Sequence, residues 1–263
     1  MKILTLIENT ACDERFACEH GLSLYIETAR HKILFDAGKS GAFAANAAKL
    51  GVDLSAVDIA VLSHGHYDHG GGLAEFMQQN SRAPIYLSKY AFEAHLNATG
   101  RDLGLNKALQ QSDRLIFTDE ELVIDEELAL YTCNDRARPF AMPPCGLSMV
   151  ENGERVPEDF RHEQYLLIRE NGRRVLISGC SHKGILNIAE WFRPDVLIGG
   201  FHFMELGTTG DDAKFITDAA QKLCTHQTQY YTGHCTGQEQ YRLLKSLMGS
   251  RVQSISSGDV LEL

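Results

Sequence analysis

The chain has 263 residues, of which 44% are hydrophobic, and this is enough to bury a substantial core. Its formal net charge is −10, with 35 acidic and 25 basic residues, which disfavours binding to nucleic acid or to an anionic membrane as a main role. No run of 18 apolar residues is present, so we expect no membrane span.

Short apolar runs in the first third of the chain predict strands that alternate with helices. An N-terminal strand is followed by a hairpin, an Ala-rich helix, a strand, a helix and a further strand. The residues are 2–8 for the first strand, 22–27 and 32–38 for the hairpin, and 41–50, 58–64, 72–79 and 84–89 for the elements that follow.

The last hundred residues predict the same order of elements. Asn171-Gly172 is a turn signal between two strands within residues 165–180. A helix, a strand, a helix, a strand with its loop, a helix and a strand follow at residues 184–192, 195–203, 212–223, 229–237, 238–248 and 252–256. Because no linker separates the halves, we expect one α/β domain, residues 1–263, made of two similar halves.

Two irregular stretches, about 90–119 and 133–161, interrupt this pattern. Long irregular segments of compact enzymes are often lids or binding loops, so we expect these two near the active site. Arg136 and Arg138 in the second stretch are candidates to bind an anionic substrate, although most surface arginines have no such role.

Seven cysteines form no C-x-x-C pair, and the amino terminus enters a strand-like pattern instead of a secretion signal. An odd number of cysteines argues against a disulfide framework. We therefore expect a cytoplasmic protein. The oligomeric state is not indicated.

The segment SHGHYDHGGGL places three imidazoles and a carboxylate directly after an apolar strand: His64, His66, Asp68 and His69. Imidazole nitrogens and carboxylate oxygens are the usual ligands of zinc, and they also bind iron or manganese. If extended backbone continues through the segment, His64 and His66 project to one side, and the turn directs Asp68 and His69 toward a second ion. The glycines permit this turn and leave the site open.

Five other histidines are expected to be surface or capping residues: His20, His31, His95, His162 and His226.

This segment resembles the H-x-H-x-D-H signature of the metallo-β-lactamase superfamily. The resemblance implies a four-layer αββα sandwich with two metal ions at one edge of its sheets. Three further segments, GCSH (179–182), GGFH (199–202) and GHCTG (233–237), resemble a subgroup of 7,8-dihydropterin-6-yl-methyl-4-(β-D-ribofuranosyl)aminobenzene 5′-phosphate synthases.

The resemblance also implies the ligands. His64, His66 and a downstream histidine would bind the first ion, and Asp68, His69 and His234 the second. Either His182 or His202 could be the downstream ligand, and we favour His182 because it follows the strand that ends at Gly179-Cys180.

Three residues have open roles. The superfamily commonly has Gly-Asp, with a bridging carboxylate, where this chain has Gly179-Cys180; Cys180 is either a thiolate ligand, which would favour zinc, or a small buried residue. His202 is a ligand, a catalytic contact to the substrate or a hydrogen-bonded core residue. Asp36 either accepts a hydrogen bond from a ligating histidine or caps a turn.

A pair of divalent ions, most simply zinc, favours hydrolysis by an activated water that Asp68 orients. About four positive charges at one point would also allow a small anionic substrate, so we predict cleavage of a small anionic ester, lactone or phosphodiester. The alternatives are the synthase reaction of the resembling subgroup and a di-iron redox reaction. A binding protein with a degenerate site is disfavoured by the intact ligand cluster.

Overall fold

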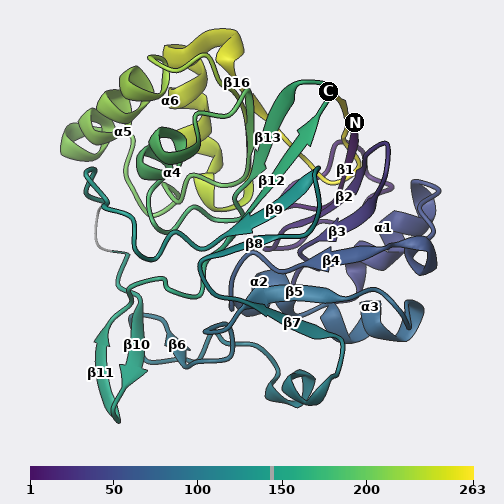
Figure 1. Cartoon of the computed structure of the whole chain (residues 1–263). Coiled ribbons are helices and arrows are strands. Elements are labelled where there is room, and N and C mark those ends of the chain that lie inside the picture. Colours follow the sequence, from purple (N-terminus) through teal and green to yellow (C-terminus); the bar gives the residue numbers. More distant parts are fainter. Residues whose placement is uncertain (143–144) are drawn as a thin grey trace.

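Two seven-stranded sheets form the centre of the molecule, and the computed structural model describes residues 1–142 and 145–263 (Figure 1). The first sheet has the order β17-β1-β2-β3-β4-β5-β7. Its strands are β1 (Lys2–Ile7), β2 (Ser23–Glu27), β3 (Lys32–Phe35), β4 (Ile59–Val61), β5 (Ile85–Ser88), β7 (Leu115–Thr118) and β17 (Val260–Glu262).

The second sheet has the order β8-β9-β12-β13-β14-β15-β16. Its strands are β8 (Glu121–Val123), β9 (Leu128–Tyr131), β12 (Tyr165–Glu170), β13 (Arg173–Ile177), β14 (Val196–Ile198), β15 (Gln229–Thr232) and β16 (Val252–Ser254). In both sheets the first three pairings in these orders are antiparallel and the last three are parallel. The predicted similarity of the two halves is therefore confirmed.

Alternating side chains of the strands build three layers of core. In β2, Leu24 and Ile26 point to the core between the sheets, while Tyr25 packs beneath the outer helices. In β12, Leu166 faces the same central core and Leu167 faces the helices of the second half. Both sheets thus bury both faces, and the predicted four-layer αββα sandwich is confirmed.

Helices cover the two outer faces (Figure 1). The first sheet carries α1 (Ala42–Lys49) and α3 (Leu73–Gln79), and α2 (Tyr67–Gly70) lies between β4 and α3. The second sheet carries α4 (Ile185–Phe192), α5 (Gly210–Leu223) and α6 (Gln238–Met248). Short 3₁₀ helices are η1 (Leu54–Ala56), η2 (Lys107–Gln111), η3 (His234–Thr236) and η4 (Gly249–Arg251). Within the described ranges no helix is long and apolar enough to span a membrane.

The two stretches interpreted as irregular contain strands that the apolar pattern did not predict. The first includes β7, an edge strand of the first sheet, and β6 (His95–Leu96). The second includes the hairpin of β10 (Ser148–Glu151) and β11 (Glu154–Pro157), which joins β6 in a small third sheet. These strands are short and half-exposed, so their sequences lack the apolar runs of buried strands.

The parallel strands of the two sheets position the candidate site. Asp36 follows β3, the motif begins after β4, Cys180 follows β13, and His202 and His234 follow β14 and β15. Loops at the carboxyl ends of parallel strands meet at one edge of a sheet, and here both halves deliver such loops to a shared place.

Candidate metal centre

The segment after β4 carries the four residues of the motif. Extended backbone at His66 leads into the single turn of α2, which begins at Tyr67. His64 and His69 are fully buried, and His66 and Asp68 retain only 5% and 7% exposure. The predicted change from extended backbone at His66 to a turn before Asp68 and His69 is therefore present.

Close backbone contacts explain the glycines of this segment. A Cβ on Gly71 would lie 2.2 Å from the Lys39 carbonyl oxygen and 2.5 Å from that of Tyr67. A Cβ on Gly65 would lie 2.2 Å from the Ala91 carbonyl oxygen. These glycines therefore let neighbouring backbone pack against the motif, a role that the sequence did not predict.

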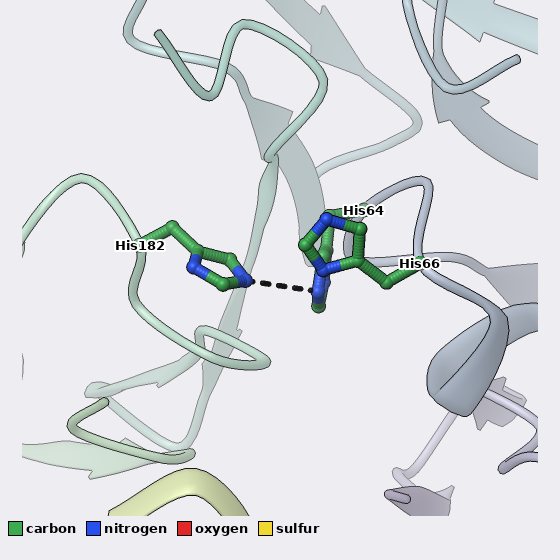
Figure 2. Close-up of side chains that lie close together, drawn as sticks. All are labelled: His64, His66 and His182. Atoms are coloured by element: carbon green, nitrogen blue, oxygen red, sulfur yellow. Dashed lines mark hydrogen bonds between the residues drawn. The ribbon is translucent and has the colours of Figure 1, made fainter. Parts of the chain in front are cut away.

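A first group of imidazoles joins the two halves (Figure 2). The Nε2 atoms of His64 and His182 are 3.2 Å apart, and a ring nitrogen of His66 lies within 4.8 Å of both. The Ser63 hydroxyl donates to Asp36 Oδ2, so it can only accept from Nδ1–H of His64. His64 therefore directs the lone pair of Nε2 toward His182.

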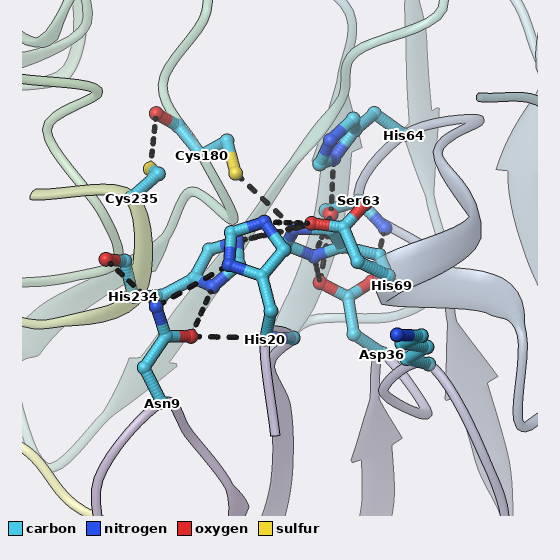
Figure 3. A network of polar contacts seen from close by, with 12 residues as sticks. Asn9, His20, Asp36, Ser63, His64, His69, Cys180, His234 and Cys235 are labelled. Atoms are coloured by element: carbon cyan, nitrogen blue, oxygen red, sulfur yellow. Dashed lines mark hydrogen bonds and ion pairs between the residues drawn. The ribbon is translucent and has the colours of Figure 1, made fainter. Parts of the chain in front are cut away.

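A second group is formed by His69 and His234, which Figure 3 shows, together with Asp68. The Nε2 atoms of the two histidines are 3.2 Å apart, and Asp68 Oδ2 lies 3.3 Å from Nε2 of His234 and 3.7 Å from that of His69. Nδ1 of His69 donates to Asp36 Oδ2 and Nδ1 of His234 donates to Asn9 Oδ1. Two nitrogen lone pairs and a carboxylate oxygen therefore converge.

Converging acceptors repel one another unless a cation lies between them. Nitrogen atoms bound at zinc distances of about 2.0–2.1 Å to one tetrahedral ion lie about 3.3–3.4 Å apart. The observed nitrogen–nitrogen separations of 3.2 Å in both groups match this spacing. The residues present therefore fit two metal ions, one in each group.

Asp36 connects the two groups. Its Oδ2 accepts Nδ1–H of His69 at 2.6 Å and the Ser63 hydroxyl at 2.7 Å, and its Oδ1 accepts Ser63 N–H at 2.7 Å. One buried carboxylate thereby fixes the tautomer of His69 directly and that of His64 through Ser63. Of its two predicted roles, the hydrogen-bond acceptor is the one that the structure shows.

Two buried carboxylates that the motif did not reveal hold the loops of the second half. Glu163 accepts the backbone N–H groups of His182 and Lys183 at 2.6 and 3.0 Å. Glu8, at the end of β1, accepts the backbone N–H of His234. Nothing in their sequence context distinguishes these glutamates from surface ones, because their partners are backbone atoms distant in sequence.

The electrostatics keep the imidazoles of the first group neutral and Asp68 charged, whereas at His234 the hydrogen bond to Asp68 outweighs burial and raises the pKa. Burial lowers the pKa values of His64 and His182 well below the usual range, and it lowers that of His66 to about 3. Burial opposes ionisation of Asp68, but the neighbouring His69 and His234 outweigh it and hold the pKa of Asp68 well below its usual value. Neutral imidazoles and an ionised carboxylate are the forms that bind a metal.

A cavity of about 570 Å³ opens onto both groups, which is within the size range of ligand pockets. The motif contributes His66 and Asp68 to its wall, and His182, His202 and His234 come from the second half. The irregular stretches contribute Asn97, Ala98, Leu103, Cys145 and Leu147. His202 has its ring 4.4 Å from that of His182, between centroids, so it is placed to contact a molecule in the cavity.

Comparison with known proteins agrees with this geometry. Residues 17–203 match the metallo-beta-lactamase superfamily. The chain belongs to this superfamily. Across the superfamily, metal ions are bound and most members are metal-dependent hydrolases, which agrees with the histidine groups described above.

Individual relatives cover nearly the whole chain. A protein of Methanocaldococcus jannaschii named 7,8-dihydropterin-6-methyl-4-(beta-D-ribofuranosyl)-aminobenzene-5'-phosphate synthase is 28% identical over 90% of this chain and 88% of its own length. The crystal structure of Tm1679, described as a metal-dependent hydrolase of the beta-lactamase superfamily, has a TM-score of 0.82 at 29% identity and covers 100% of this chain and 99% of that one. Zn(2+)-bound PqqB from Methylobacterium extorquens shares the fold at a TM-score of 0.60 and 11% identity, with full coverage of both chains.

Cys180, one of the residues with an open role, lies beside both groups. Its Sγ lies 3.1 Å from Nε2 of His69, and it lies within 4.8 Å of ligand atoms of His64, His234 and Cys235. Burial raises the pKa of this thiol, so the thiolate form needs a cation beside it. The position therefore suits a soft ligand between the two groups.

Two histidines that we expected at the surface are buried beside the centre. His95 and His162 have 1% and 0% exposure, and their rings stack with centroids 3.8 Å apart. Nδ1 of His95 pairs with Glu158, and Nδ1 of His162 accepts Gly65 N–H. This last bond places the proton of a neutral His162 on Nε2, which makes that nitrogen a donor and not a metal ligand. The burial of His95 and His162 was not predicted because charged residues, such as Glu93 and Arg161, stand near them in the sequence.

The other three histidines are at least partly exposed, as expected. His31 pairs with Asp125 and His226 contacts Glu190, both away from the cavity. His20 lies at the cavity wall with Nε2 3.4 Å from Asp68 Oδ2.

Arg136 and Arg138 lie elsewhere. The Arg136 guanidinium packs over Phe192 and Tyr131, at 5.3 and 5.9 Å from their ring centroids. Arg138 donates to the Asp159 carbonyl oxygen. Neither residue belongs to the described wall of the cavity, so a role in binding substrate stays a prediction without support from this geometry.

Proposed function

We propose that the protein is a metal-dependent hydrolase that cleaves a small ester, lactone or phosphodiester. The observation that supports this most directly is the second group, where Nε2 of His69, Nε2 of His234 and Oδ2 of Asp68 converge at 3.2 to 3.7 Å, a set of ligand atoms that suits one metal ion. We also propose the cytoplasm as its compartment, since all seven cysteines are free.

Two divalent ions would supply Lewis acidity and an activated water at neutral pH. His64, His66 and His182 would hold one ion, and Asp68, His69 and His234 the other, with Cys180 between them. Zinc suits an imidazole, carboxylate and thiolate set best, and iron or manganese is the alternative.

The chain's own residues would then orient the reaction. Asp68 belongs to the cavity wall as a charged acceptor and can align the proton of an attacking water. His202 is held neutral, because burial lowers its pKa to about 4, and it can donate a hydrogen bond to the substrate. No serine nucleophile with a histidine base was recognised in the sequence, which agrees with attack by water.

The experiment is hydrolysis of bis(p-nitrophenyl) phosphate by protein purified without chelators and supplied with zinc, manganese or iron. We expect metal-dependent release of p-nitrophenol, and we expect His66→Ala to abolish it. His31→Ala is the matched control, because His31 pairs with Asp125 far from the cavity. A protein that neither contains nor takes up a transition metal would refute the proposal.

A second candidate is the synthase reaction, because the relative of that name is 28% identical over 90% of this chain. The same residues would hold the ions, but no water would be consumed. Incubation with a pterin and a ribofuranosyl-aminobenzene phosphate distinguishes the two. A coupled product together with no cleavage of any ester or phosphodiester would favour the synthase.

A further inference from the structure

The wall of the cavity lacks a conventional anion-binding side chain. Among the described wall residues none is lysine or arginine, while Asp68 and Glu205 are acidic. A substrate that carries a negative group away from the bond to be cleaved would therefore need cations at the edge of the cavity. Two cations lie next to one residue of the wall, Tyr67.

Tyr67 is part of the wall, and Lys39 and Arg101 both lie over its ring. Lys39 Nζ is 5.9 Å and Arg101 Cζ is 5.6 Å from the ring centroid. Both side chains are exposed, and within the described ranges neither forms an ion pair with a carboxylate. Most structural arginines of this chain, such as Arg114 and Arg161, are instead bound to backbone oxygens or carboxylates.

The backbone at both cations is fixed. Lys39 N–H donates to Glu19 Oε1 at 2.9 Å, and the Lys39 carbonyl packs against Gly71 of the motif. Arg101 N–H donates to Asn97 Oδ1 at 2.9 Å, and Arg155 donates to the Asn97 carbonyl at 2.8 Å. Asn97 itself belongs to the cavity wall. The loops that carry Lys39 and Arg101 are therefore both held by hydrogen bonds or close packing of their backbone.

We propose that Lys39, Arg101 and the ring of Tyr67 form a subsite for a phosphate or carboxylate group of the substrate, remote from the bond that is cleaved. This inference rests on the proposed function and specifies where the substrate's charge lies. The two cations supply charge-assisted hydrogen bonds to anionic oxygens, and the Tyr67 ring between them and the cavity keeps the two charges near its wall. For this contact to an anion the sequence offered Arg136 and Arg138 only as candidates.

The test measures binding and needs no turnover. Calorimetry on metal-loaded protein compares phenylphosphonate, benzoate and neutral benzamide in wild type and in the double variant Lys39→Gln/Arg101→Gln. We expect the Kd of an anion to rise about tenfold and that of benzamide to change less than twofold. The anion with the larger change identifies phosphate or carboxylate as the preferred group.

Two control variants make the result specific. Lys39→Arg/Arg101→Lys keeps both charges and should bind anions within about twofold of wild type, while Arg82→Gln/Lys107→Gln removes two exposed cations outside the cavity wall and should have no effect. Equal changes for anions and benzamide, or no change for either anion, would overturn the subsite. Anion binding that depends on Lys39 and Arg101 in a protein without hydrolytic activity would support the subsite and refute the hydrolase.

Discussion

The two halves of this superfamily member provide their candidate ligands in different ways. The first half places His64, His66, Asp68 and His69 in one segment after a single strand. The second half provides Cys180, His182, His202 and His234 from loops after three separate strands. The first half therefore contributes residues that are adjacent in sequence. The second half contributes residues that only the fold brings together.

The backbones of these two sides also differ. In the first half, glycines without positive φ let neighbouring chain pack against the motif, as at Gly71. In the second half, three non-glycine residues adopt left-handed conformations, with φ of 59° at Ser181, 57° at His202 and 49° at His234, whereas in the first half Asp36 (φ 57°) is the site residue that does so. Such conformations cost of the order of 1 kcal/mol each and persist because buried carboxylates such as Glu163 and Glu8 hold the loops.

The strongest test of a shared centre is to remove one ligand from each half. His64→Ala and His182→Ala should each lose the same metal ion, because their Nε2 atoms face one another at 3.2 Å. Each should lower kcat by about 10³-fold or more, since a bound ion supplies several kcal/mol. Metal analysis by mass spectrometry should give one ion per chain in both variants.

This test also decides between the downstream histidines. If His182→Ala keeps two ions and full activity while His162→Ala or His202→Ala loses one, the ligand assignment of the second half is wrong. The double variant His64→Ala/His182→Ala should be no worse than either single variant, because residues that act as a unit are not additive.

Gly71→Ala tests the close packing of the first half. A Cβ at this position would meet two carbonyl oxygens at 2.2 and 2.5 Å, so backbone must move, and we expect a loss of about 3 kcal/mol in the free energy of unfolding. Gly41→Ala is the control, because its Cβ would meet only the flexible Glu75 side chain at 3.3 Å and its φ is −74°. Urea unfolding measures both. Equal stability of the two variants would show that the glycines have another purpose.

The same contrast explains what the sequence could predict. The motif residues are adjacent in the chain, so their chemistry is visible without a structure, and the duplicated order of elements is visible from apolar runs. His162, Glu163 and Glu8 acquire their roles through bonds to backbone atoms far away in sequence, such as Gly65 N–H. Strand β17 returns from the end of the chain to pair with β1, and a three-residue strand has no pattern of its own.

Asp36 tests whether one carboxylate serves both groups. Asp36→Asn removes the charge that holds Nδ1–H of His69 and the Ser63 hydroxyl, so we expect each ion to bind about 10- to 100-fold more weakly. Competition with a chromogenic chelator measures both affinities. Asp53→Asn is the control, because Asp53 caps η1 at the surface. Weakening of only the ion at His69 would show that the connection through Ser63 to His64 has no effect.

The smallest expected effect separates His66 from His202 by their pH dependence in metal-free protein. Both rings are neutral when folded, with pKa values lowered by burial to about 3 and about 4, whereas an unfolded histidine titrates near about 6.5. Below that pH the unfolded chain binds more protons, so stability falls as pH falls, by about 1.4 kcal/mol per pH unit and ring. Replacing either ring by Asn should make stability less dependent on pH between pH 6 and 5, because the variant lacks the proton that this ring binds on unfolding. Urea unfolding in the presence of a chelator measures the change. Below about pH 4 the His202 contribution should end first, because its folded form then takes up the proton as well. An unchanged slope in both variants would mean that these rings are already charged in the folded, metal-free protein.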